Sequence, residues 1–275
     1  MASLVRKRSF LRLIGLVFVI AAAVVTILVV TGRGGFDYDD PFETFPADQP
    51  RGSAGSVPGA PDLDRRLLGF LSFVARDVQG FWGREFEGAG RDYRPAQVVA
   101  FRSAVRSRCG LASDGTGPFY CPLDRRVYLD MPFFRILAVE FGAPGDFAQA
   151  YVVAHELGHH VQTITGVTAQ VMEATASDPA AAHDLSIRFE LQADCLAGVW
   201  GHSTYERGLL ERGDLDEGLR AAAAVGDDVV QVRARGRIDP ETWTHGSAEQ
   251  RRNWFLRGFV SGDPSGCDTF SVAEP

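Results

Sequence analysis

Hydrophobic residues form one long unbroken run near the start of the chain. Residues 13–31 are nineteen positions without a charged side chain. As an α-helix this run is about 28 Å long, close to the roughly 30 Å hydrocarbon core of a bilayer. We therefore predict a transmembrane helix over residues 13–31. A cleaved signal peptide is one alternative, but the run is longer than a usual signal-peptide apolar region and no small-x-small site follows it cleanly. A buried helix of a soluble domain is the other.

The charged residues on the two sides of this run differ in sign. Those before it are all basic: Arg6, Lys7, Arg8 and Arg12. Those just after it are mostly acidic: Arg33, Asp37, Asp39 and Asp40. The positive-inside rule then predicts a single-pass protein of the cell membrane, with residues 1–12 in the cytoplasm and the rest extracytoplasmic. Residues 32–61 are rich in Gly, Pro, Ser and Asp, which is typical of a flexible linker.

Beyond the linker, over residues 62–275, hydrophobic positions recur with the spacings of a folded domain. Asp62 is placed to cap a helix whose apolar residues follow helical spacing as far as Trp82. Between Tyr93 and Asp130 the runs VVAF and RVYLD have the pattern of short strands around a loop flanked by cysteines. These runs predict a small antiparallel sheet.

Later segments return to helical spacing. The stretch DFAQAYVVAHELGHHVQ begins at Asp146, which can cap it, and Gly166 can end it. The Ala-rich residues 167–183 separate it from a second helix that starts near Asp184. Residues 215–231 and 247–260 also have a helical pattern, the second opened by a capping box of Ser247 and Gln250. The fold class predicted is α+β and mainly helical.

Composition and charge narrow the class of protein. Hydrophobic residues make up 45% and aromatic residues 11% of the chain, as in globular proteins. The net charge is −7, and the chain beyond residue 12 has 24 basic against 35 acidic residues, a net charge of −11. Such a domain repels phosphate groups, so we exclude nucleic acid as a partner.

Four cysteines lie in the part of the chain predicted to be extracytoplasmic, where an even number favours two disulfides. Cys109 and Cys121 flank a Gly-rich loop that a bridge can close. Cys195 and Cys267 are then expected to pair. The alternative is four reduced, buried thiols. No spacing fits a CxxC zinc ribbon.

Residues 155–159 read HELGH, an HExxH motif within an apolar helical stretch. Residues four apart lie about one turn apart on the same helix face, so His155 and His159 can bind one metal ion. Glu156 lies beside the first ligand, where its carboxylate can accept a proton from metal-bound water as the catalytic base. The alternative is an amphipathic helix with a solvated His–Glu pair, but the apolar flanks favour a buried one.

A catalytic zinc site characteristically takes three protein ligands and keeps the fourth position open. Downstream, RFELQADCLAGVW places Glu190 and Asp194 on one face of an apolar helix, where paired acids are costly unless they bind something. We predict Glu190 as the third ligand of one zinc ion. Asp194 is predicted to accept the free ring N–H of a ligating histidine and so to fix its tautomer.

The other histidines have weaker claims on a metal. His160 follows His159 by about 100° around the helix, so we expect it to point away from the metal and to have a structural or supporting role. His183 and His202 are predicted to be surface or capping residues.

His245, in THGSAEQR, has two open interpretations. It can stabilise the N-terminal cap of the following helix, which is the slightly favoured interpretation. Alternatively, it can face the cleft as a catalytic residue and stabilise the oxyanion of a tetrahedral intermediate. Tyr151 and Arg251 have weaker claims on the oxyanion role, and the sequence does not rank them.

Beyond these motifs, the chain resembles the neutral zinc metallopeptidase family of bacterial membrane-anchored proteins. The resemblance rests on long blocks along the outer domain: YRPAQVVAF, CGLASDGTGPFYCPLDRRVYLD, GDFAQAYVVAHELGHHVQ, LSIRFELQADCLAGVW, GDD and THGSAEQRRNWFLRGFVSGDPSGCDTF. HExxH followed by a helix bearing ExxxD is also similar to the gluzincin peptidases. This implies a zincin-like metallopeptidase domain in which His155, His159 and Glu190 are ligands, Glu156 is the base and Asp194 is the histidine partner.

The sequence therefore predicts a membrane-anchored, extracytoplasmic zinc metalloendopeptidase whose partner is a peptide or protein substrate. Two alternatives stay open. One is a catalytically silent envelope scaffold stabilised by zinc, although a structural site closes its fourth position with a protein ligand and does not need Glu156. The other is an amidase that acts on cell-wall peptides.

Overall fold

The computed structural model of the protein describes residues 60–113 and 115–275. The predicted cytoplasmic N-terminus, the predicted transmembrane helix 13–31 and nearly all of the predicted linker lie outside these residues. Among the described residues no helix is both long enough and apolar enough to cross a membrane. The structure therefore bears on the predicted metallopeptidase domain.

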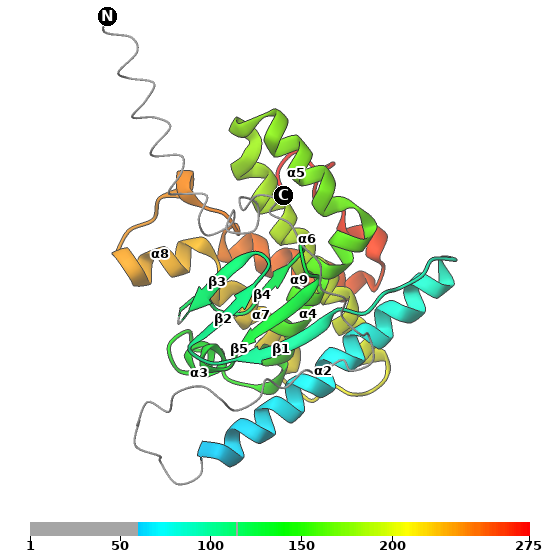
Figure 1. Ribbon diagram of the computed structural model, residues 1–275, viewed down its shortest axis with the longest axis vertical. Helices are drawn as coiled ribbons and strands as arrows, with labels where there is room; N and C mark the ends of the chain where they lie inside the picture. The colour runs from blue at the N-terminus through cyan, green and yellow to red at the C-terminus, as the bar shows by residue number, and fades with distance from the viewer. Residues whose placement is uncertain (1–59, 114) are drawn as a thin grey trace, which may run out of the picture.

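A three-stranded sheet lies on one side of the helices (Figure 1). Its strand order is β1 (Gln97–Phe101), β5 (Arg126–Asp130) and β4 (Phe119–Cys121). The predicted purely antiparallel sheet is wrong, because β1 pairs with β5 in parallel and only β4 is antiparallel to β5. Parallel neighbours need a long crossover. Here the crossover contains β4 and a separate antiparallel hairpin, β2 (Ala104–Ser107) and β3 (Gly110–Ser113).

The two faces of the sheet bury different partners, as the alternation of side chains along a strand requires. Val98, Val127 and Leu129 belong to the main core, which the helices complete. Val99 and Tyr128 point the other way, into a smaller cluster with the β2–β3 hairpin. The sheet is therefore covered on both faces, which accounts for its short, apolar strands.

The main core is built around α4 (Asp146–Thr165), which is buried along nearly its whole length. The long helix α2 (Ala60–Gly88), α6 (Ala182–Glu206) and α7 (Asp214–Ala224) pack against it. Helix α9 (Ala248–Ser261) packs along α6. The remaining helices are shorter or more exposed: α3 (Met131–Val139), α5 (Val167–Ser177), α8 (Asp227–Arg235) and the 3₁₀ turns Pro179–Ala181, Pro240–Thr242 and Pro264–Cys267.

Several predicted helix boundaries need correction. The first helix begins at Ala60, so Asp62 lies within it and does not cap it. Asp146 is the first residue of α4 and not its cap, although Gly166 ends that helix in the left-handed conformation as predicted. The Ala-rich stretch after Gly166 is itself helical, because alanine favours helix even where no residue of the segment is buried.

The predicted helix over residues 215–231 is two helices. The helix is interrupted at Gly226, which lies between α7 and α8. A methyl group on Gly226 would overlap the backbone of Ala248, so the break is packed directly against the start of α9. The predicted capping box of Ser247 and Gln250 at that start is confirmed.

Glycines let α6 touch its two neighbours backbone to backbone. A methyl group at Gly258 of α9 would overlap the carbonyl oxygen of Cys195, and one at Gly198 of α6 would overlap that of Phe255. On the α4 side, a methyl group at Gly158 would lie 3.0 Å from the carbonyl oxygen of Ala193. Side chains on α4, α6 and α9 are thereby held at short and fixed separations.

Both predicted disulfides are confirmed. Cys109 is bonded to Cys121, which closes the crossover loop beside the small sheet cluster. Cys195 is bonded to Cys267, which ties α6 to the segment after α9. All four cysteines are buried and none of them is free.

Candidate metal centre

Two histidines of α4 and a glutamate of α6 face one another within the domain. Nε2 of His155 lies 3.2 Å from Oε2 of Glu190, and Nε2 of His159 lies 3.5 Å from Oε1 of the same carboxylate. One potential ligand atom from each of the three residues lies within 4.8 Å of the other two. The structure thus brings together the three side chains that the sequence proposes as metal ligands.

Asp194 contacts His155 on the side away from Glu190. Its Oδ1 lies 2.8 Å from Nδ1 of His155. An ionised carboxylate only accepts hydrogen bonds, so this contact places a ring proton on Nδ1, and Nε2, which faces Glu190, is the nitrogen left to bind a metal. That tautomer is the one that a metal ion requires.

Arg251 of α9 binds the carboxylate of Asp194 from a third helix. Its Nε donates to Oδ2 at 2.8 Å and its Nη2 donates to Oδ1 at 3.0 Å. The hydroxyl of Tyr151 donates to the same Oδ1 at 2.5 Å. Tyr151 and Arg251 are almost fully buried, and both donate hydrogen bonds to Asp194. Their side chains are therefore committed to Asp194 and are not placed to stabilise an oxyanion.

The charges in this cluster shift the pKa values of its members. Burial raises the pKa of Asp194, but Arg251 and His155 together outweigh burial and lower it. Burial also raises the pKa of Glu190, yet the neighbouring histidines hold it well below its usual range. Burial lowers the pKa of His155, but Asp194 reverses the effect and raises it to about 9. Both carboxylates of α6 are therefore ionised at neutral pH and attract a cation to the imidazoles.

Glu156 is buried beside these residues but is not part of the cluster of possible ligands. Burial raises the pKa of its carboxyl group, although the two adjacent histidines act in the opposite direction. A raised pKa brings a carboxylate closer to the working pH and suits it to accepting and returning a proton. The arrangement is compatible with the role of base that the sequence predicts.

His159 is supported by a neutral group. Its Nδ1 lies 2.8 Å from Oε1 of Gln162, one turn further along α4. The ring also stacks on Phe189 at a centroid distance of 4.9 Å. Gln162 thus fixes the tautomer of His159 as Asp194 fixes that of His155, with Nε2 of both rings left for a metal.

The other histidines lie where the sequence expects them. His160 is buried and points away from the metal ligands, with its Nδ1 3.0 Å from the hydroxyl of Tyr120 and its Nε2 2.6 Å from the carbonyl oxygen of Arg94. His183 contacts the carbonyl oxygen of Pro240, and His202 that of Phe259. None of the three belongs to a cluster of possible metal ligands among the described residues.

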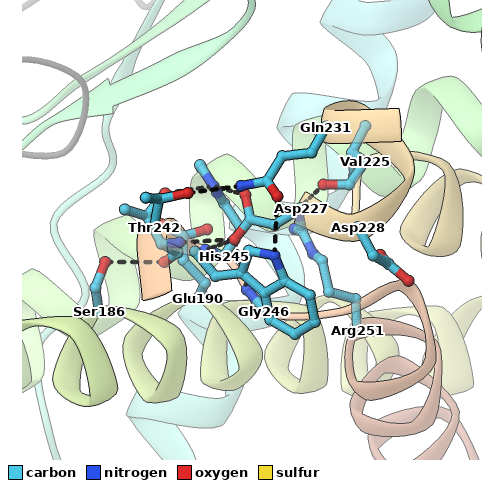
Figure 2. Close-up of polar contacts among 12 residues, drawn as sticks. Ser186, Glu190, Val225, Asp227, Asp228, Gln231, Thr242, His245, Gly246 and Arg251 are labelled. Atoms are coloured by element: carbon cyan, nitrogen blue, oxygen red, sulfur yellow. Dashed lines mark hydrogen bonds and ion pairs between the residues drawn. The ribbon is translucent and has the colours of Figure 1, made fainter. Parts of the chain in front are cut away.

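His245 lies beside Glu190, on the segment that precedes α9 (Figure 2). Its Nδ1 lies 3.2 Å from Oδ1 of Asp227 and 2.9 Å from Oγ1 of Thr244. Oδ2 of Asp227 accepts the backbone N–H groups of Thr244, His245 and Gly246 at 2.7, 2.6 and 3.1 Å. Asp227 therefore holds both the backbone and the ring of His245, whose side chain is 38% exposed.

Gln231 holds the rest of this segment from the same helix, α8 (Figure 2). Its Oε1 accepts the backbone N–H of Asp239 at 2.7 Å, and its Nε2 donates to Oγ1 of Thr242 at 2.9 Å. The indole N–H of Trp243 donates to Oε1 at 3.3 Å. Asp227 and Gln231 are one turn apart on α8, so a single helix positions residues 239–246 over the site.

Sequence reasoning missed Asp227 and Gln162, and it did not identify what Arg251 does. The contact of Gln162 with His159 could have been predicted, because residues three apart on a helix are neighbours and a ligating histidine needs an acceptor for its free ring N–H. The contacts of Arg251 and Asp227 could not, because each residue meets its partner only after distant helices pack.

The donor set suits zinc. Two imidazole nitrogens and one carboxylate oxygen are ligands that zinc takes in catalytic sites, where three protein groups leave one position open. Each histidine has an acceptor on Nδ1, so Nε2 of each ring is the nitrogen that can bind the ion. His155, His159 and Glu190 are the residues that would hold the ion.

Comparison with known proteins gives one family. The family model described as "Putative neutral zinc metallopeptidase" matches residues 13–270, nearly the whole chain. The match begins at the first residue of the predicted transmembrane helix and ends beyond Cys267.

Two similar proteins are themselves uncharacterized. The chain is 42% identical over 245 residues to the uncharacterized protein YpfJ of Escherichia coli K12, covering 89% of this chain and 84% of the relative. It is 39% identical over 259 residues to the uncharacterized protein Rv2575 of Mycobacterium tuberculosis H37Rv, covering 90% of this chain and 86% of the relative. No solved structure gives a significant match.

Proposed function

The chain belongs to the neutral zinc metallopeptidase family, and from this premise we propose that it is a membrane-anchored zinc metalloendopeptidase that hydrolyses peptide bonds outside the cytoplasm. Family membership supports zinc-dependent hydrolysis in general terms. The bond cleaved, the anchor and the location of the reaction are our proposal.

One observation carries the proposal. Three side chains, His155, His159 and Glu190, direct ligand atoms at one another, while Glu156 lies next to them and outside the set. A structural zinc site has four protein ligands and no use for a buried, unliganded carboxylate. The arrangement therefore favours catalysis over the alternative of a silent scaffold.

In the proposed reaction, zinc when bound supplies a Lewis acid that polarises the scissile carbonyl and acidifies water. Glu156 accepts the proton of the attacking water and passes it to the leaving amine. His245, held by Asp227, donates a hydrogen bond from Nε2 to the oxyanion of the tetrahedral intermediate. Asp194 and Gln162 keep both ligating rings in the required tautomer.

The membrane location rests on the sequence and on the disulfides. Residues 13–31 have the length of a bilayer-spanning helix, and the basic residues before them favour a cytoplasmic N-terminus. Two buried disulfides in the domain support an oxidising compartment. We infer that the protein is bitopic, with residues 62–275 acting on peptides or proteins outside the cytoplasm.

Metal removal tests the function. Full-length protein stripped with a chelator is expected to cleave no peptide of a mixed library, and one equivalent of zinc is expected to restore cleavage, because the site has one set of three ligands. Mass spectrometry of the library products is the measurement, with isolated cell wall treated in parallel. Cleavage by the metal-free protein would contradict the proposal. Zinc binding without any cleavage would favour the scaffold, and release of peptides from cell wall alone would favour the amidase.

His245→Ala is expected to lower kcat by roughly 100- to 1,000-fold, the usual cost of losing an oxyanion donor. The zinc dissociation constant should stay within about twofold of wild type, since His245 is not among the possible ligands. Steady-state kinetics and chelator competition measure the two effects. His202→Ala is the matched control, because His202 lies outside the site and is expected to leave kcat unchanged. If His245 merely settles the helix cap, the variant will lose thermal stability and retain kcat.

A further inference from the structure

A chain of side-chain amides connects His159 to the carbonyl of a disulfide-bonded cysteine. Oε1 of Gln162 lies 2.8 Å from Nδ1 of His159. Nε2 of Gln162 donates to Oε1 of Gln192 on α6 at 3.1 Å. Nε2 of Gln192 in turn donates to the carbonyl oxygen of Cys267 at 3.0 Å. Three consecutive hydrogen bonds thus cross from α4 through α6 to the end of the chain.

The direction of these bonds is consistent throughout. An amide that accepts at its oxygen and donates from its nitrogen passes the same polarity on to the next group. The carbonyl of Cys267 can only accept, and it therefore sets the orientation of Gln192 and through it that of Gln162. Gln162 must then present its oxygen to His159, which keeps the proton on Nδ1 and the lone pair of Nε2 free. Nε2 of Gln162 also donates to the carbonyl oxygen of Phe189 at 2.7 Å, which reinforces the same orientation.

The end of the chain that carries Cys267 is itself fixed to α6. We call residues 264–275 the C-terminal strap. Its disulfide joins Cys267 to Cys195, the residue after Asp194. Arg188 donates to three strap carbonyls, those of Thr269 at 2.6 Å, Val272 at 2.8 Å and Ala273 at 3.1 Å. The hydroxyl of Thr269 returns a hydrogen bond to the carbonyl oxygen of Arg188 at 2.7 Å.

The two ends of the amide chain lie where water does not compete, whereas Gln192 between them is half-buried. Gln162 is 1% exposed, Cys267 is 2% exposed and Thr269 is fully buried. In a low-dielectric interior, hydrogen bonds in a chain strengthen one another, and a broken member leaves its partner unsatisfied. Loss of the bond to Cys267 therefore frees Gln192 and weakens the hold on Gln162, which keeps its bond to Phe189.

From this geometry we propose that Gln162 and Gln192 are positioning residues for His159, and that the C-terminal strap, through the Cys195–Cys267 disulfide, is part of the support of the metal site. This inference rests on the proposed function, because it assigns His159 to zinc. It gives the two disulfides different roles. Cys195–Cys267 acts on the site, whereas Cys109–Cys121 holds the distant sheet loop.

Zinc affinity of the full-length protein tests the proposal. Gln192→Met removes both hydrogen bonds of the Gln192 side chain at nearly constant volume. Cys195→Ala with Cys267→Ala removes the disulfide that ties the strap to α6. Each is expected to weaken zinc binding by about 10-fold, the lower end of the effect of losing a partner of a metal-ligating histidine. Cys109→Ala with Cys121→Ala is the matched control and should bind zinc as wild type does. An equal loss in that control would show general loosening and overturn the proposal.

Combining the variants distinguishes a relay from two independent defects. If the strap acts through Gln192, Gln192→Met with both strap cysteines replaced should bind zinc no more weakly than the weaker of the two parent variants, because the chain is already broken. Losses that multiply would overturn the relay, as would wild-type affinity in both parent variants.

A second measurement does not depend on zinc. In metal-free protein, ¹⁵N NMR of the imidazoles should show His159 as the Nδ1–H tautomer in the wild type and as a mixture of tautomers in Gln192→Met. His160, whose partners are Tyr120 and Arg94, serves as the internal reference and should not change. An unchanged His159 spectrum in the variant would overturn the proposal. Failure of the wild type to bind zinc would instead refute the proposed function, and the tautomer would still report on the relay.

Discussion

Glu156→Gln is expected to abolish turnover and to leave zinc bound at one ion per chain. The amide has nearly the shape of the carboxylate but cannot accept the proton of the attacking water. Loss of a general base lowers rates by roughly 100- to 10,000-fold. Glu156 lies outside the ligand cluster, so the metal should be retained. The measurements are kcat/KM on a peptide from the library and zinc content by elemental analysis.

Two comparison variants make this result specific. Glu173→Gln makes the same change on the exposed face of α5 and is expected to behave as wild type. Glu190→Ala removes a predicted ligand, and it is expected to lose both activity and zinc. A Glu156→Gln protein that cleaves peptides at the wild-type rate would refute the assigned base, and unchanged zinc content in Glu190→Ala would remove Glu190 from the ligand set.

Arg251→Met is expected to have the largest effect on stability. Asp194 is fully buried and the side chain of Arg251 is 4% exposed, so the variant leaves a carboxylate inside the protein without its cation. Breaking a buried ion pair in this way typically costs about 3–5 kcal/mol. Denaturant unfolding of the full-length protein measures the loss. The adjacent Arg252 is exposed, and Arg252→Met should change stability by less than about 0.5 kcal/mol.

A second substitution identifies the cause of that loss. In Arg251→Met with Asp194→Asn, no unpaired charge remains, so the double variant should be more stable than Arg251→Met alone. Its zinc affinity should still be weaker than wild type, because a neutral amide is a poorer partner for His155. If the two losses of stability simply add, the buried charge is not the source of the effect.

The local features of the fold were largely predictable. The capping box at Ser247, the end of α4 at Gly166 and the strands at VVAF and RVYLD depend on neighbouring residues in the chain, and the structure has all of them. The errors in the sheet pairing and in the helix over residues 215–231 occurred where tertiary contacts decide. The pairing of β1 with β5 is parallel because the crossover folds back as a hairpin and β4, and no local pattern encodes that path. The break at Gly226 is set by the approach of Ala248.

The candidate site divides in the same way. Helical spacing alone places His155 with His159, and Glu190 with Asp194, because residues four apart share a face. That the two pairs meet depends on Gly158, which lets α4 and α6 approach closely. The sequence gives Arg251 only a weak claim on the oxyanion role. Its function as the counter-ion of Asp194 appears only when α9 crosses α6.

By itself, the sequence predicted the donor set, the base and the partner of each cysteine, and it fixed the composition of the domain, since these follow from residue type and from spacing along the chain. Only the tertiary structure decided how the donors are supported. Three supporting interactions join segments far apart in the sequence: Arg251 with Asp194, Asp227 with His245, and the amide chain from Gln162 to Cys267. The reason is physical: a buried polar group must find a partner, and which partner it finds depends on how the helices pack.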